Sequence, residues 1–356
     1  MLAAPRAAAM AALSPLDRAL RARASDLSAP PVFIVGPPRS GTTLLYEALV
    51  TRYRFSYFSN ISHRLHRTPV AGTWIGRNAI RSWTGNFESN YGHIPGWGSP
   101  NEGGWIWKRW IPEEHALDAG DVNDRPVQCM RQTVAAIAEL IGAPFINKNV
   151  MHSVHMRLLD AIYPGCLFIE CSRDITATAR SILKARRDEF GESGMKEWLS
   201  VRPPGWEQVK DESPARQAVA QVALTRQAIE RDAQAIGADR LATVSYEELC
   251  AAPEAMAGQV KAFLASHGVD VEARHALPER FEQRPPRIAF RRHVAVQEHL
   301  RILRSQQGER ADPGVILTAP AMGLHQLQDG VNVVADHGSR RVGRRELQFL
   351  EAVQIV

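Results

Sequence analysis

The sequence is poor in cysteine and has no paired-cysteine pattern. Only 4 cysteines occur in 356 residues, and they are Cys129, Cys166, Cys171 and Cys250. No two of them form a C-x-x-C pair, so neither a zinc or redox site of that kind nor a disulfide framework is indicated. We therefore expect free thiols in a reducing compartment, the cytoplasm.

Long hydrophobic runs are also missing. A membrane-spanning helix needs about 20 consecutive apolar residues, and no segment of the chain has them. The first thirty residues are rich in alanine and arginine but lack a continuous apolar core, so we expect neither a secretory signal nor a membrane anchor. We predict that residues 1–29 are an N-terminal extension, with a disordered start and a short amphipathic helix over 16–27.

Acidic residues are outnumbered by basic ones, 38 to 43, which gives a net charge of +5. A positive chain favours anionic ligands. No helix-turn-helix, zinc-finger or stacking-platform pattern accompanies the charge, so we expect no nucleic-acid partner.

A strand–turn–helix pattern dominates the N-terminal part of the chain. An apolar, β-branched run over 32–35 predicts a buried strand, and the apolar spacing over 44–49 predicts a helix. The turn between them begins at Gly36 and contains Arg39. Backbone amides of such a turn and the dipole of the following helix form a site for an anion.

The turn nearly matches a Walker A loop, because Gly36 and Gly41 stand as G-x-x-x-x-G and Thr43 follows at the hydroxyl position. The lysine position, however, holds Thr42. A nucleoside triphosphate needs that lysine on its β- and γ-phosphates. Its absence indicates an anion smaller than a triphosphate.

Strand and helix patterns alternate along the rest of the chain. We predict further strands over 144–148, 166–171 and 241–245, and helices over 127–141, 153–163, 173–187, 214–235 and 253–267. This alternation predicts an α/β fold of three layers, with a central parallel sheet covered by helices on both faces. We place this domain at 30–311, and 312–356 remain as a C-terminal appendage or tail.

An aromatic-rich insertion interrupts this alternation at about 60–125. Six of the 8 tryptophans fall within 70–112, among many glycines and prolines: Trp74, Trp83, Trp97, Trp105, Trp107 and Trp110. We predict loop structure here, and we assign the insertion to the acceptor side because aromatic faces suit sugar rings. A side lobe with its own small core is the alternative.

A second anion site is indicated where the strand over 166–171 ends. Arg173 follows at the carboxyl end, where open α/β sheets bind ligands. Ser181 lies slightly over two helical turns further on, near the same face. An arginine and a hydroxyl at one point suit a phosphate monoester. A helix cap formed by Arg173 and Asp174 is the structural alternative.

Together these segments resemble the nucleotide-binding motifs of sulfotransferases, which use 3′-phosphoadenosine 5′-phosphosulfate (PAPS). Residues 38–45, PRSGTTLL, resemble the 5′-phosphosulfate loop, and R-D-x-x-x-x-x-x-S from Arg173 to Ser181 resembles the 3′-phosphate motif. The resemblance implies a P-loop-like sulfotransferase fold, PAPS as co-substrate and no metal. The residues it assigns to the nucleotide are Pro38, Arg39, Ser40, Gly41, Thr42, Thr43, Arg173, Ser181, Tyr246, Arg291 and Arg292.

The last three assignments have structural alternatives. Tyr246 resembles the tyrosine of a strand-ending segment near the nucleotide, but the acids after it also suit a helix N-terminus. Arg291 and Arg292 fall where the family often places a late loop on the 3′-phosphate, but they also suit a solvated charged face.

Catalysis would use Arg39 and the turn amides on the leaving phosphate. Lys148 ends the strand over 144–148, and the resemblance implies that it lies beside the transferring group. A hydroxyl acceptor also needs a general base. Glu102, His152 and Glu47 are candidates, and we favour Glu102.

We therefore predict a PAPS-dependent sulfotransferase that acts in line on a hydroxyl of a carbohydrate, glycan or other small-molecule acceptor. A P-loop nucleotide kinase or NTPase is the alternative, with Thr42 as the feature against it. A non-catalytic binding protein on the same scaffold is a third possibility.

Overall fold

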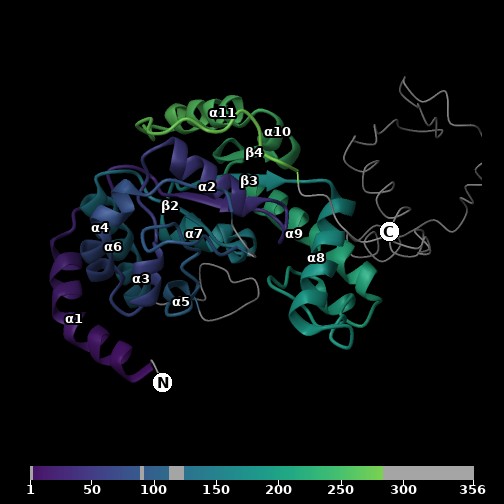
Figure 1. Ribbon diagram of the computed structural model, residues 1–356, viewed down its shortest axis with the longest axis horizontal. Helices are drawn as coiled ribbons and strands as arrows, with labels where there is room; N and C mark the ends of the chain where they lie inside the picture. Colours follow the sequence, from purple (N-terminus) through teal and green to yellow (C-terminus); the bar gives the residue numbers. More distant parts are fainter. Residues whose placement is uncertain (1–2, 89–91, 112–123, 284–356) are drawn as a thin grey trace, which may run out of the picture. The chain divides into compact units, whose positions relative to one another are not determined.

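A computed structural model describes residues 3–88, 92–111 and 124–283 of the chain. They belong to a unit that spans Met1–Ile288, and the second unit, Ala289–Val356, falls outside the described residues. The described strands form one parallel sheet in the order β2-β1-β3-β4 (Figure 1). They are β1 (Val32–Val35), β2 (Ile146–Lys148), β3 (Leu167–Ser172) and β4 (Leu241–Ser245).

Helices cover both faces of this sheet (Figure 1). One face packs on α2 (Thr42–Arg52), α10 (Tyr246–Ala251) and α11 (Pro253–Ser266). The other packs on α6 (Asp124–Ile141), α7 (Met156–Ile162) and α9 (Pro214–Ile236). Side chains of β1 alternate between the two cores, with Ile34 in the first and Phe33 in the second. The predicted three-layer α/β fold is confirmed.

The register brings the anion-site segments together. Val32 pairs with Leu167, and Val35 pairs with Glu170. Because β1 and β3 are parallel neighbours, the residues after their carboxyl ends leave the sheet side by side. The turn at 36–41 and Arg173 therefore share one edge. Helix α8 (Ile175–Phe190) starts from that edge and packs on α9.

The prediction of a loop over the start of the insertion is wrong. Residues there form α3 (Asn60–Arg64), α4 (Pro69–Ser82) and, further on, α5 (Gly104–Trp107). The glycines of α4 serve helix packing and do not break the helix. A β-carbon on Gly76 would lie 2.5 Å from Ile61 Cδ1, and one on Gly72 would lie 3.1 Å from Ser62 Cα. The glycines let α4 approach α3 closely.

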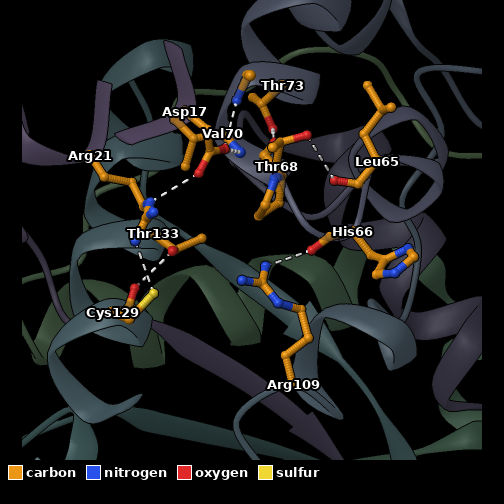
Figure 2. Close-up of polar contacts among 12 residues, drawn as sticks. Asp17, Arg21, Leu65, His66, Thr68, Val70, Thr73, Arg109, Cys129 and Thr133 are labelled. Atoms are coloured by element: carbon orange, nitrogen blue, oxygen red, sulfur yellow. Dashed lines mark hydrogen bonds and ion pairs between the residues drawn. The ribbon is translucent and has the colours of Figure 1, made fainter. Parts of the chain in front are cut away.

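The prediction of a disordered start is also wrong. Helix α1 runs over Ala3–Arg23 and contacts α4 and α6. Its Asp17 is 2% exposed. Asp17 Oδ1 accepts the backbone N–H groups of Val70 (2.9 Å) and Ala71 (3.1 Å), while Oδ2 accepts from Arg21 Nε at 3.0 Å (Figure 2). Since Thr68, the residue before α4, makes no side-chain cap, Asp17 supplies the cap from a different helix.

All four cysteines are free, as predicted; Cys166, Cys171 and Cys250 are buried, and Cys129 is half-buried. Arg21 Nη1 lies 2.9 Å from Cys129 Sγ, so this arginine joins α1 to α6. No helix in the described ranges is long and apolar enough to cross a membrane.

We expect Asp17→Ala to lower the free energy of unfolding by about 2–3 kcal/mol, because two buried amides of α4 lose their acceptor. Urea unfolding followed by circular dichroism would measure the loss. Asp17→Asn keeps an oxygen acceptor and should cost less than the alanine variant. The exposed Asp270→Ala is the control, with an expected change within about 0.5 kcal/mol. Equal stability of Asp17→Ala and the control would contradict the trans-helix cap.

Candidate functional site

The turn after β1 is held to the rest of the sheet at its first residue. Gly36 N–H donates to Ser153 Oγ at 2.9 Å, and that hydroxyl donates back to the Gly36 carbonyl at 3.1 Å. A β-carbon at Gly36 would lie 2.7 Å from the carbonyl oxygen of Cys171 on β3. Only glycine allows this approach. Sequence reasoning missed Ser153, which lies in the 3₁₀ helix η2 (Val150–Val154) and matches no motif.

The turn and the start of α2 contain donors of the kind that bind anions. Arg39 and Gly41 have left-handed backbone angles, φ 69° and φ 103°, and helix α2 starts after Gly41 without a side-chain cap. The first amides of α2 therefore lack an intrahelical partner. The hydroxyl of Ser40 is buried and has no hydrogen-bond partner in the structure. These orphan donors fit an anion at the start of α2.

The two predicted anion sites are joined by direct contacts. Arg39 Nε donates to Ser181 Oγ at 3.2 Å, and Arg173 NH1 donates to the Arg39 carbonyl at 3.2 Å. Arg39 thus spans from the turn to α8. Asp174 caps α8 by accepting from Ala177 N–H at 2.7 Å. The helix cap considered as an alternative is therefore present, and the Arg173 side chain is still directed at the turn.

Tyr246 completes this cluster. The Arg173 guanidinium lies 4.2 Å from the centroid of the Tyr246 ring, a cation–π contact. The same ring lies against the turn, where a β-carbon on Gly41 would come within 2.3 Å of Tyr246 Cδ2. Tyr246 begins α10, with Glu247 in its first turn, so the helix N-terminus foreseen as an alternative is also present. Arg226 on α9, which the sequence did not single out, donates to the Arg173 carbonyl.

A carboxylate and an ammonium form the second part of the site. Lys148, the last residue of β2, donates to Glu102 Oε1. Its side chain is 4% exposed and that of Glu102 is 33% exposed. Lys148 is therefore not a surface lysine, and its partner remains accessible. A proton acceptor with one open face is what a general base requires.

Asparagines on both sides of Lys148 hold the segment that carries Glu102. Asn147 Nδ2 donates to the Asn101 carbonyl at 3.2 Å, and Asn149 Nδ2 to the Glu102 carbonyl at 3.4 Å. Asn101 N–H also donates to the Phe58 carbonyl at 2.7 Å. The sequence Asn-Lys-Asn thus fixes the backbone of the segment that carries the Glu102 carboxylate.

The structure does not bring His152 to this site. The ring is 2% exposed and lies edge-on to Phe33 and Trp107, at 5.1 and 4.9 Å between centroids. His152 Nε2 hydrogen-bonds Asn147 Oδ1 at 3.0 Å. Burial lowers the histidine pKa well below 6.5, with further lowering by His155 and Lys148. We therefore treat His152 as a core histidine.

Glu47 is also outside the candidate site. It is fully buried on α2, and its Oε1 accepts the Phe87 N–H at 2.8 Å. The carboxylate holds the chain after α4 in place. Arg291 and Arg292 lie outside the described residues. The described residues contain no group of three or more His, Cys, Asp or Glu side chains that could hold a metal ion.

Comparison with protein families gives one match. The model of a family described as "Sulfotransferase family" matches residues 30–270, which is more than half of the chain. No curated protein sequence gives a significant match.

Comparison with solved structures gives distant likenesses. Sulfotransferase STF9 from Mycobacterium avium is 16% identical, with 72% of this chain and 67% of that chain covered and a TM-score of 0.47. Sulfotransferase STF1 from Mycobacterium tuberculosis H37Rv is 13% identical, with 70% and 69% covered and a TM-score of 0.45.

We expect Gly41→Ala to destabilise the protein by more than about 2 kcal/mol, because alanine is strained at this backbone angle and its β-carbon displaces Tyr246. Thermal unfolding would measure the change. Gly258→Ala is the matched control: Gly258 is exposed on α11, and a β-carbon there meets nothing within 4 Å. The control should gain about 0.5–1 kcal/mol from helix propensity. Similar shifts in both variants would contradict the close packing of Tyr246 on the turn.

Proposed function

The chain belongs to the sulfotransferase family, and we propose that it transfers a sulfuryl group from PAPS to a hydroxyl of a carbohydrate or other small-molecule acceptor. The observation that carries this proposal is the contact of Arg39 with Ser181, 3.2 Å from Nε to Oγ. This contact supports a 5′ anion site and a 3′ anion site within reach of one side chain. A nucleotide with phosphate on both ends of its ribose matches that pair of sites.

The residues at the turn would hold the phosphosulfate end of PAPS, which supplies an activated sulfuryl group when bound. Amides of the turn and the hydroxyls of Ser40, Thr42 and Thr43 would donate to it. Arg173 and Ser181 would hold the 3′-phosphate. Arg39 lies between the two groups, so we assign it to both. Tyr246 holds Arg173 in place from the opposite side through its ring.

The acceptor side is assigned to Glu102 and Lys148. Glu102 takes the proton of the acceptor hydroxyl as the new O–S bond forms and the S–O bond to the phosphate breaks. Lys148 orients the carboxylate and adds positive charge beside the transferred oxygens. Arg39 and the turn amides stabilise the charge that develops on the departing phosphate. The proton ends on Glu102 and the electron pair on the phosphate oxygen.

A nucleotide kinase or NTPase fits the turn less well. Thr42 occupies the position where a triphosphate needs a lysine, and its side chain is 3% exposed on the first turn of α2. A non-catalytic binding protein would keep the two anion sites without a base. The accessible Glu102 carboxylate next to buried Lys148 supports an enzyme.

We expect 3′,5′-adenosine bisphosphate to stabilise the protein, and ATP with Mg²⁺ to do so less, because the site is built for a 3′-phosphate and lacks the triphosphate lysine. A thermal-shift titration of both ligands would test this. A stronger shift with ATP and Mg²⁺ would reject the sulfotransferase in favour of the kinase.

We expect Arg173→Ala to weaken the bisphosphate about 10–100-fold and Ser181→Ala about 10-fold, because each removes a hydrogen bond to a charged group. Binding of 5′-AMP, which has no 3′-phosphate, should change little. Calorimetric titration would give both affinities. Arg187→Ala is the control, because Arg187 lies on the same helix and pairs with Glu192 at the surface. Equal losses for the two nucleotides would contradict the assignment of the 3′ site.

We expect Glu102→Gln to lower kcat by about 10²–10⁴-fold, the usual contribution of a general base. Bisphosphate affinity should stay unchanged, because Glu102 does not contact the turn or Arg173. Glu88→Gln is the matched control, as the other carboxylate between residues 57 and 110. A labelled-donor assay over glycans, phenols and other hydroxylated acceptors supplies the substrate. An unaltered kcat in Glu102→Gln would remove this residue from the mechanism.

A further inference from the structure

The segment that carries Glu102 continues onto an exposed surface. It runs alongside the first residues of α3. Asn60 N–H donates to the Ser99 carbonyl at 3.1 Å, and Ile61 N–H donates to the Trp97 carbonyl at 3.2 Å. Glu102 is therefore at one end of the segment and Trp97 near the other. A group bound at Trp97 would therefore contact the same segment that carries Glu102.

Two of the tryptophans in this region face solvent. Trp97 is 64% exposed and Trp105 is 59% exposed, whereas Trp107 and Trp110 are buried in the core. Exposed indole rings offer flat faces on which a sugar ring can stack. Among the tryptophans that we assigned to the acceptor side, the exposed ones are therefore the candidates for contact with an acceptor.

Each of these two tryptophans is next to a basic or imidazole side chain from α3 or the residues after it. The Arg64 guanidinium is 5.2 Å from the Trp97 ring centroid, and the His66 ring is 6.1 Å from that of Trp105. Arg64 is exposed and makes no ion pair with any described residue. An indole beside an open guanidinium presents a stacking face and an anion-binding fork together.

Further cations surround His66 and are held by neutral acceptors. Arg109 NH1 donates to the His66 carbonyl at 2.7 Å (Figure 2). Arg6 donates to the Arg64 carbonyl at 2.6 Å and to His66 Nδ1 at 3.0 Å. We call these residues the acceptor surface: Arg6, Arg64, His66, Trp97, Trp105 and Arg109.

Carboxylates are scarce around the acceptor surface. The sequence from 57 to 110 has six lysines and arginines and three histidines, against two acids, Glu88 and Glu102. Glu102 pairs with Lys148, and Asp17 of the nearby α1 pairs with Arg21 and caps α4. None of the described acids therefore forms an ion pair with Arg6, Arg64 or Arg109.

Cations of the acceptor surface also shift the pKa values of two nearby histidines. Burial lowers the pKa of His66, and Arg6, Arg109 and Arg67 lower it further. Burial, then His66 and Arg6, lower the pKa of His63 to about 4, while Glu102 acts in the opposite direction. His63 of α3 therefore lies within electrostatic reach of both Glu102 and Arg6.

We infer that the acceptor is a saccharide that already carries an anionic group, such as a carboxylate or a sulfate or phosphate ester. The inference rests on the proposed function, and it names the acceptor class of the same site. In this arrangement a sugar ring of the saccharide stacks on Trp97. The anionic group of the saccharide binds Arg64 and the other cations of the acceptor surface, and one of its hydroxyl groups reaches Glu102. Neutral sugars would use the stacking face alone.

Binding of matched oligosaccharides tests this inference without turnover. The probes are tri-galacturonate, its neutral carboxyl-reduced counterpart, galactotriose, and pairs of neutral and sulfated or phosphorylated trisaccharides of one sugar. Calorimetry at two salt concentrations, with inorganic phosphate as a third arm, separates ring binding from attraction of any anion. We expect a charged member to bind about 10-fold or more tightly than its neutral partner, and more tightly than phosphate.

Variants locate the binding. We expect Arg64→Gln to remove most of the preference for the charged member, and Trp97→Ala to weaken both members. Arg77→Gln is the matched control, because Arg77 stacks on the exposed Trp74 of α4 in the same way, at 4.9 Å. No preference for charge in any pair would overturn the inference, as would equal losses in Arg64→Gln and Arg77→Gln or phosphate binding as tight as the trisaccharides.

The bisphosphate titration keeps the two proposals apart. If 3′,5′-adenosine bisphosphate binds but no charged saccharide is preferred, the acceptor class is wrong and the sulfotransferase proposal stands. If the bisphosphate does not bind, the proposed function fails, whatever the saccharides show. Arg64→Gln should bind the bisphosphate like the wild type, which also shows that the variant is folded.

Discussion

The site depends on one constraint: two loops that each carry an arginine must meet at the same edge of the sheet. The parallel pairing of β1 with β3 satisfies it, because the turn after Val35 and Arg173 leave adjacent strands in the same direction. Gly36 lets the turn approach Cys171, and Gly41 admits the ring of Tyr246. Arg39 then reaches Ser181, and Arg173 reaches the Arg39 carbonyl. With a less compact turn, the two arginines would be separate surface charges.

The fold and the nucleotide side could be predicted from the sequence. The strands β1 and β3 are covered on both faces, so β1 is entirely apolar and β3 is apolar apart from Glu170 and Ser172, which distinguishes them from the helices around them. The turn and the R-D-x-x-x-x-x-x-S segment each consist of residues that are close together in the chain, so both can be recognised in the sequence. The spacing from Arg173 to Ser181 predicts that the two residues lie near one face, and in the structure each of them contacts Arg39.

The acceptor side could be predicted only in part, for reasons that lie in tertiary packing. Gly72 and Gly76 look like turn residues, but they allow α4 to pack on α3. His152 and Lys148 are four residues apart, yet η2 turns the histidine into the core between Phe33 and Trp107. Asn147 and Asn149 have no motif of their own; their role appears only when the chain from Phe58 and the Glu102 segment are seen together. The spacing of residues likewise could not predict that Glu102 forms an ion pair with Lys148.

The docking of α1 changes what counts as the minimal enzyme. The family match begins at residue 30, and trimming the chain there would appear harmless. It would remove Asp17 from the first turn of α4, Arg6 from His66 and Arg21 from Cys129. Helix α4 supports α3, and α3 borders the segment that carries Glu102. A protein shortened to residue 30 would keep the contacts of Arg39 with Ser181 and Arg173, but α4 would lose the support of the first helix.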